Sequence, residues 1–268
     1  MPFLQSIGPK SSLRDEPATF PFSVPVIRAL ETIELPTPVT FFVGENGSGK
    51  STLLEAIAAA VGVPTVGSES VRDDATLGAQ RALGKRLRLA WTTRTHKGFF
   101  LRAEDFFGFT KYIARLRSEL QERLAEIEVE YADRSAWARG LASGPSAASI
   151  AELQQRYGVN LDANSHGESF LRLFRSRFVP GGIYLLDEPE APLSPQSQLG
   201  LLAMLKEMVA DQSQFIIATH SPILLAFPNA TIYSFDERPA KRVAFEDLEH
   251  VNLTRDFLNN PSAFLRHL

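Results

Sequence analysis

A glycine-rich turn between an apolar run and an alanine-rich segment constrains this chain more than any other feature. The turn reads Gly44-Glu45-Asn46-Gly47-Ser48-Gly49-Lys50-Ser51 and fits the phosphate-loop pattern G-x-x-x-x-G-K-[ST]. Val39 to Val43 before the turn predicts a buried strand, and Leu53 to Val61 after it predicts a helix. Because strand, loop and helix follow one another in this order, a phosphate-binding unit is favoured over a plain glycine-rich turn.

The residue types of the turn suit a polyphosphate. Glycines let the backbone curl so that several N–H groups point at one anion, and the next helix presents its positive N-terminal end to that anion. Lys50 supplies a mobile charge for the β- and γ-phosphates, and the Ser51 hydroxyl is a ligand for Mg²⁺. We therefore expect ATP and Mg²⁺ as cofactors. The expected nucleotide-binding residues of the turn are Gly44, Glu45, Asn46, Gly47, Ser48, Gly49, Lys50, Ser51 and Thr52.

Two adjacent acids follow a second apolar run. Residues 183–186 predict a buried strand, and Asp187 and Glu188 stand at its end. Acids at the carboxyl edge of a parallel strand lie where open α/β sheets bind ligands. With a phosphate loop in the same chain, we expect Asp187 to hold Mg²⁺ together with Ser51. We expect Glu188 to orient the attacking water, with Lys50 as a further catalytic residue.

Strands and helices alternate along much of the chain. A helix is expected over residues 199–209 and a third buried strand over 215–218, so the sheet should be mainly parallel, with helices on both faces. Seven prolines among the first 38 residues indicate short edge strands, and we expect an N-terminal antiparallel β portion. We expect one α/β domain over residues 1–268, with a helical insert at approximately 106–180.

Within that insert, apolar residues recur at steps of three and four from residue 110 to about 139. The favoured interpretation is one amphipathic helix packed on its own domain. A short projecting antiparallel hairpin is the alternative. Residues 140–149 are small and are expected to form a loop.

Four segments together resemble the ABC ATPase superfamily, namely 44–52, 165–169, 183–194 and 218–222. In the signature position, Ser165-His166-Gly167-Glu168-Ser169 departs from the transporter form Leu-Ser-Gly-Gly-Gln and is similar to the Ser-x-Gly-Glu form of soluble ABC-type ATPases. The resemblance implies that Ser165 and Gly167 contact the γ-phosphate held by a second protomer. Ser165 and Glu168 also form a capping box for a helix over 170–178, which is the purely structural alternative.

His220, in Ala218-Thr219-His220-Ser221-Pro222, matches the switch histidine of that family, and the resemblance makes it a catalytic residue that senses the γ-phosphate. The motif Thr219-His220-Ser221-Pro222 is more similar to the recombination, chromosome-maintenance and overcoming-lysogenization groups of ATPases than to transporters. The resemblance implies a P-loop NTPase fold of the ABC head type, with ATP-dependent head-to-tail dimerisation.

The family's glutamine loop has no clear counterpart. Residues 99–107 resemble a Phe-Arg-Ala-Glu-x-Phe-Phe segment of small stand-alone ATPases, so Arg102 or Glu104 approaches either Mg²⁺ or the partner. A buried aromatic cluster with a paired Arg and Glu is an equal alternative. Phe22 is either an adenine-stacking residue or a core residue.

Composition narrows the class of protein. The net charge of −3 gives no global basic field for nucleic acid, and the absence of cysteine fits a reducing, cytoplasmic compartment. No apolar run reaches the roughly 18 residues that span a bilayer, so a membrane is reached only through a partner subunit. The tail from residue 236 is charged and packs on the domain or binds a partner.

Three functions are therefore compared. The first is a soluble ATPase that forms a homodimer when it binds ATP and that serves DNA repair or phage defence. Whether it binds nucleic acid is left open. The second is the ATP-binding subunit of an ABC transporter. The third is an ATP-gated clamp with negligible turnover.

Overall fold

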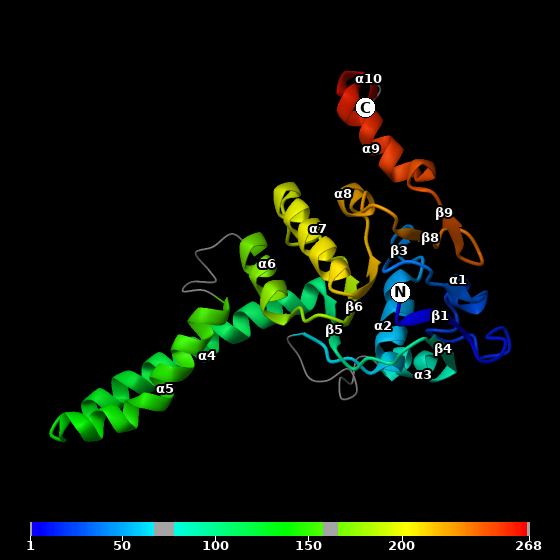
Figure 1. Ribbon diagram of the computed structural model, residues 1–268. Coiled ribbons are helices and arrows are strands. Elements are labelled where there is room, and N and C mark those ends of the chain that lie inside the picture. The colour runs from blue at the N-terminus through cyan, green and yellow to red at the C-terminus, as the bar shows by residue number, and fades with distance from the viewer. Residues whose placement is uncertain (1, 67–77, 158–165, 267–268) are drawn as a thin grey trace.

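A computed structural model describes residues 2–66, 78–157 and 166–266 of the chain (Figure 1). Its main sheet has the strand order β5-β6-β7-β3-β8-β9. The strands are β3 (Val39–Val43), β5 (Gly98–Arg102), β6 (Ile183–Asp187), β7 (Gln214–Ala218), β8 (Thr231–Ser234) and β9 (Lys241–Val243). Only β9 runs antiparallel to its neighbour, so the predicted mainly parallel sheet is confirmed.

The central strands form because their side chains are apolar on both faces. Every residue of β3, β6 and β7 is buried, which confirms the three strands predicted from continuous apolar runs. In β3, Phe41 and Phe42 point into different hydrophobic clusters on opposite faces of the sheet. The carboxyl ends of these parallel strands consequently meet at one edge of the sheet.

A separate antiparallel sheet has the order β2-β1-β4, with β1 (Leu4–Pro9), β2 (Ile33–Glu34) and β4 (Leu87–Trp91). The predicted N-terminal antiparallel portion is therefore present. The expectation of edge strands alone was wrong, because β1 is the central strand. The only proline in β1 is its last residue, Pro9, so the N–H groups before it remain available for pairing.

Helices cover both faces of the main sheet. On one face lie α2 (Lys50–Val61), which carries much of the apolar cluster shared with β1, and α3 (Gly78–Arg86), which packs against α2. On the other lie α6 (His166–Arg177), α7 (Pro195–Ala210) and the short α8 (Pro222–Leu225). The short α1 (Pro25–Arg28) lies beside the start of α2, where the side chains of Val24 and Val26 contact the loop at Gly49.

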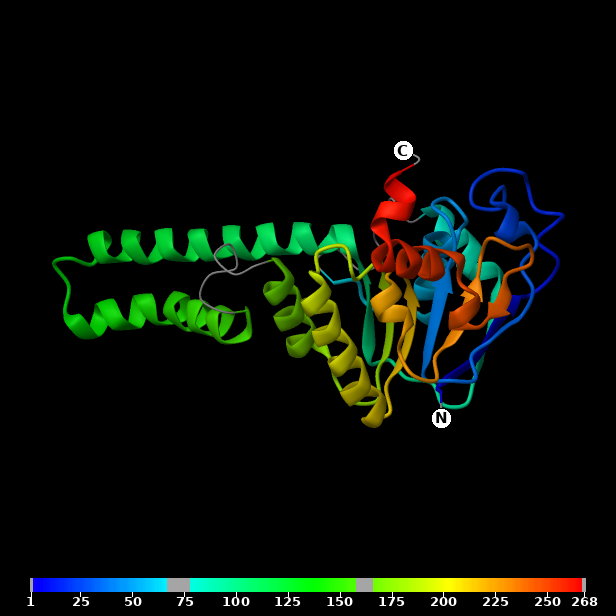
Figure 2. The same cartoon turned by 90° about the horizontal axis from the view of Figure 1, so that it is seen from above.

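The helices α4 (Ala103–Glu130) and α5 (Ala136–Tyr157) form an antiparallel hairpin that projects from the sheet (Figure 2). The favoured expectation of one helix packed on the domain was wrong, and the hairpin alternative is correct. The helical periodicity was real, because Ile113 and Ile127 are buried, but periodicity does not identify the element that covers them. The loop expected at 140–149 was also wrong, since these residues, Pro145 included, lie within α5.

The tail contains a 3₁₀ helix η2 (Phe245–Asp247), α9 (Glu249–Asn259) and α10 (Pro261–Leu265). It begins against the domain, because Leu248 and Val251 are buried in the cluster that includes α8. The rest of α9 extends away from the sheet (Figure 1). Within the described residues, none of the helices combines the length and the apolar character that crossing a bilayer requires.

Candidate functional site

The glycine-rich turn connects β3 to α2 at the carboxyl edge of the sheet, as predicted. Gly44 has a φ of 144°, and a side chain there would place its Cβ 2.9 Å from Oδ1 of Asp236. Gly49 has a φ of 103°, and its Cβ would lie 2.7 Å from a side-chain carbon of Val26. Both positions therefore require glycine for two reasons, the backbone conformation and the close neighbours.

Lys50 is held inside this turn. Its side chain is buried, and Nζ donates to the carbonyl oxygens of Gly44 at 2.6 Å and Glu45 at 2.9 Å. Burial lowers the pKa of Lys50, whereas the charges of Glu188 and Asp187 oppose that shift. The ammonium group thus lies among acids and loop carbonyls at the start of α2, where a polyphosphate would meet it.

Ser51 and Asp187 come together across the sheet edge. The Ser51 hydroxyl donates to Oδ1 of Asp187 at 3.0 Å. Burial raises the pKa of Asp187 to about 7, the Ser51 hydrogen bond opposes the rise, and the nearby charge of Glu55 adds to it. A buried carboxyl group with an adjacent hydroxyl is an all-oxygen donor pair, and the charge of Lys50 offsets its burial only in part.

This pair fits Mg²⁺, which proteins bind through one or two oxygen ligands while substrate phosphates and waters complete the shell. Within the described ranges, no group of three His, Cys, Asp or Glu side chains is placed to hold a metal ion by itself. A divalent ion at Ser51 and Asp187 would accordingly depend on the nucleotide for its remaining ligands.

Glu188 and His220 face each other beside the turn. His220 Nε2 lies 3.9 Å from Oε1 of Glu188, whose side chain is 45% exposed. Glu188 adopts a φ of 48°, an uncommon conformation for a residue with a side chain, while its N–H still bonds to the Ala218 carbonyl at 2.9 Å. The backbone turn redirects the Glu188 side chain from the sheet toward open space. Burial lowers the pKa of His220, and the charge of Lys50 lowers it further.

Glu190 and Asp236, which the sequence did not single out, hold His220 and the phosphate loop in place. Oε1 of Glu190 accepts the His220 N–H at 2.7 Å, and Oδ1 of Asp236 accepts the Glu45 N–H at 2.7 Å. Burial raises the pKa of Glu190, whereas hydrogen bonds from Thr219 and from the His220 amide oppose that rise. Glu190 was detectable as a third acid after Asp187 and Glu188. Asp236 had no local signal, because its partner is 191 positions away.

The remaining predicted residues lie in different places. Ser165 is outside the described residues, and Gly167 lies in the first turn of α6 and is not among the residues that line the cleft at the turn. Arg102 pairs with Asp105 at 3.0 Å and with Glu55 at 3.4 Å, which favours the paired-residue alternative. The side chain of Glu104 is outside the described part. Phe22 is buried in the core, which favours its core alternative.

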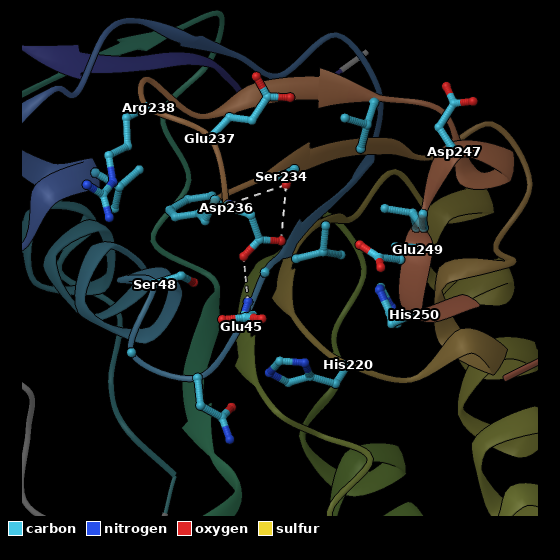
Figure 3. Close-up of a pocket in the computed structure, with 18 of the residues that line it drawn as sticks. Glu45, Ser48, His220, Ser234, Asp236, Glu237, Arg238, Asp247, Glu249 and His250 are labelled. Carbon is cyan, nitrogen blue, oxygen red and sulfur yellow. Dashed lines mark hydrogen bonds between the residues drawn. The ribbon is translucent and has the colours of Figure 1, made fainter. Parts of the chain in front are cut away.

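A cleft of about 740 Å³ opens beside the turn (Figure 3). Residues 43–48 line it together with His220, the segment after β8 and the beginning of α9. A second hollow, lined by Glu45, Asn46, Gly47, Glu188 and His220, opens on the Glu188 side. The volume of the cleft lies within the range of small-ligand and cofactor sites.

Comparison with known protein families gives one match, which covers part of the chain. Residues 23–98 match a protein family described as AAA domain, a range that contains β3, the glycine-rich turn and α2. No curated protein matches the sequence. Within residues 23–98 the strand–loop–helix order predicted for a phosphate loop is present, so this part of the chain is similar in sequence to an AAA domain and has the expected local geometry.

The solved structures that match this chain include the following ATPase heads and cassettes. An Smc head domain with an extended coiled coil from Pyrococcus furiosus is 13% identical, with a TM-score of 0.46, and the match covers 96% of this chain and 100% of that chain. An SMC head domain from Thermotoga maritima is 14% identical, with a TM-score of 0.43 and coverage of 91% and 98%. An ATP-binding cassette of an ABC transporter in its ADP conformation is 16% identical, with a TM-score of 0.46 and coverage of 95% and 99%.

Proposed function

We propose that the protein binds ATP with Mg²⁺ at residues 44–52 and hydrolyses it with Asp187, Glu188 and His220. The observation that carries the proposal is the hydrogen bond between Ser51 and Asp187, because it joins the phosphate loop to the acidic end of β6. Lys50, Glu188 and His220 surround this junction. A cation, an oxygen donor pair and an exposed carboxylate at one helix N-terminus are the groups that phosphoryl transfer to water requires.

Each side chain then has a distinct task. The N–H groups of the turn and the Lys50 ammonium bind the β- and γ-phosphates. Ser51 and Asp187 hold Mg²⁺, which neutralises negative charge on the phosphates when it is bound. Glu188 accepts a hydrogen bond from the attacking water and aligns it with the γ-phosphorus. His220, fixed through its backbone by Glu190, donates to a γ-phosphate oxygen.

The proposal includes a head-to-tail dimer. The hollow at Glu188 and His220 is open to solvent, and water exclusion strengthens electrostatic interactions in a catalytic site. A second copy would close it with its own Ser165 and Gly167. ATP would drive closure, because the γ-phosphate supplies the bridging charge. A role in DNA repair or phage defence stays a prediction. The rate of ATP hydrolysis measured with and without DNA tests whether DNA stimulates the enzyme.

Two variants test the proposal, each with a matched control. Lys50→Ala should abolish detectable ATP binding, while Lys111→Ala on the exposed surface of α4 should bind ATP as the wild type does. Glu188→Gln should still bind ATP but lose at least about a hundredfold in hydrolysis rate, and should accumulate as an ATP-bound dimer in light scattering. Glu119→Gln, an exposed position on α4, is its control. Retained hydrolysis in Glu188→Gln would contradict the role given to that carboxylate.

A further inference from the structure

The cleft beside the phosphate loop has a second wall that comes from the C-terminal segment. Residues 43–48 line one side, and Asp247, Glu249, His250 and Leu253 line the other. Figure 3 shows His220 and His250 on one side of the cleft and Glu45 and Asp236 on the other. A segment about two hundred positions after the phosphate loop therefore borders the same space.

The position of His250 is fixed by its neighbours in α9. Leu248 and Val251 flank it and are buried in the cluster that contains α8. The Asn252 side chain donates to the Glu246 carbonyl at 2.7 Å, and its N–H donates to the Leu248 carbonyl at 3.0 Å. The first turn of α9 is consequently attached to the domain on both sides of His250, whereas Leu253 and Leu258 further along are exposed.

His250 carries a polar atom without a partner. Its Nε2 is buried and has no hydrogen bond to any described residue, and the same holds for Nε2 of His220. A buried polar atom without a partner is unfavourable, so two such atoms beside one cleft indicate a ligand that supplies the partners.

The charges around His250 indicate which end of a nucleotide it would meet. Burial lowers the pKa of His250, the charge of His220 lowers it further, Asp236 opposes the shift, and Lys50 contributes a smaller lowering. The ring therefore lies within electrostatic reach of the two groups assigned to the terminal phosphate. At neutral pH a neutral imidazole still offers one N–H donor to a phosphate oxygen.

We infer that His250 is a further nucleotide-binding residue, whose Nε2–H donates to an oxygen of the terminal phosphate of ATP. The inference rests on the proposed function, since it requires ATP in the phosphate loop. It makes the start of α9 part of the nucleotide site and gives the C-terminal segment a contact that exists with ATP and is absent with ADP.

The affinities of the full-length protein for Mg-ATP and Mg-ADP test this contact. His250→Ala should weaken Mg-ATP binding about tenfold, as expected for one hydrogen bond to a charged group, and change Mg-ADP binding less than twofold. His250→Gln keeps an N–H donor and should lose less than His250→Ala. His96→Ala, an exposed histidine after β4, is the matched control and should bind both nucleotides as the wild type does. Unchanged Mg-ATP affinity in His250→Ala overturns the inference, and an equal loss for both nucleotides overturns the terminal-phosphate contact.

Hydrogen exchange of the wild type gives an answer even if His250→Ala folds poorly. Saturating Mg-ATP should slow exchange of the amides of residues 247–253 at least about threefold more than saturating Mg-ADP does. Equal exchange with both nucleotides overturns the inference while leaving the proposed function intact. A wild type that binds no ATP at all would instead remove the proposed function, and this contact with it.

Discussion

The Ser51 hydroxyl lies 3.0 Å from Oδ1 of Asp187, although 136 positions separate the two residues in the sequence. Ser51 lies in the first turn of α2 and Asp187 is the last residue of β6. Both lie at the same sheet edge, because α2 follows directly on the loop after β3, and β6 is parallel to β7, the neighbour of β3. The packing of the parallel sheet thus places a hydroxyl donor against a buried carboxyl group before any ligand is present. The loop and the acidic strand end therefore form one site.

The first prediction concerns this hydroxyl. Ser51→Ala removes a proposed Mg²⁺ ligand and the hydrogen bond to Asp187, so the Mg²⁺ concentration for half-maximal ATP hydrolysis should rise about tenfold or more. A Mg²⁺ titration of the hydrolysis rate measures the change. Ser118→Ala, on the exposed surface of α4, should keep the wild-type requirement. An unaltered Mg²⁺ requirement in Ser51→Ala would show that the hydroxyl is not a ligand.

The second prediction concerns stability and pH. Burial raises the pKa of Asp187 to about 7, from an ordinary value of 3.8. Between these values the folded protein keeps a proton that the unfolded chain has lost. The free energy of unfolding should therefore fall by about 1.4 kcal/mol per pH unit as the pH rises from about 4 to about 7, and this contribution should be constant above pH 7.

Asp187→Asn cannot titrate, so its stability relative to the wild type should increase between pH 4 and pH 7. Denaturant unfolding at pH 5 and pH 8, without nucleotide or Mg²⁺, measures this difference. The control Asp133→Asn, in an exposed turn, should follow the wild-type pH dependence. If Asp187→Asn differs from the wild type by the same amount at both pH values, the carboxyl group is not protonated in the fold.

Local sequence was sufficient for much of the fold. The apolar runs 39–43, 183–186 and 215–218 were predicted as buried strands, and each lies in a strand whose residues are all buried. The phosphate loop and Asp187–Glu188 could also be recognised from the sequence, because each motif stands at the carboxyl end of a predicted strand. A parallel sheet necessarily brings such strand ends to one edge.

Other features depend on which elements meet, and no local pattern determines that. The strand β5 was missed because its apolar run, Phe99 to Leu101, continues into an aromatic helical segment without a break. The hairpin was not favoured because α4 and α5 cover each other away from the sheet. Asp236 was missed because its partner Glu45 is 191 positions distant, and His250 was missed because no local pattern shows that α9 borders the phosphate loop.

The third prediction uses two glycines with opposite surroundings. Gly98 has a φ of 120°, and an added Cβ would lie 1.8 Å from the Ile183 carbonyl oxygen, so Gly98→Ala should disrupt the pairing of β5 with β6. We expect a loss of at least about 2–3 kcal/mol in the free energy of unfolding. Gly140→Ala in α5 meets no atom within 4 Å and should stabilise by roughly 0.5–1 kcal/mol. Urea unfolding measures both, and an unchanged Gly98→Ala would contradict the steric argument.

The last prediction concerns Arg102, the final residue of β5. Its guanidinium group contacts Asp105 at 3.0 Å and Glu55 at 3.4 Å, and all three side chains are largely buried. Arg102→Met would leave two buried carboxylates without this cation, although Gln80 still donates to Glu55 at 2.9 Å. We expect a loss of about 2–4 kcal/mol in urea unfolding, somewhat less than for a fully buried pair because Arg102 is 14% exposed.

Arg123→Met removes an exposed ion pair on α4 and should change the free energy of unfolding by less than about 0.5 kcal/mol. The charge of Glu55 raises the pKa of Asp187, so the single variant Glu55→Gln should lower the pKa of Asp187.

The double variant Arg102→Met with Glu55→Gln should recover part of the lost stability, because the uncompensated carboxylate is then neutral. If the double variant is no more stable than Arg102→Met, the attraction between Arg102 and Glu55 does not explain the loss. That result would count against the interpretation that Arg102 is a structural partner of Glu55, and would favour the alternative in which Arg102 approaches Mg²⁺ or a partner subunit.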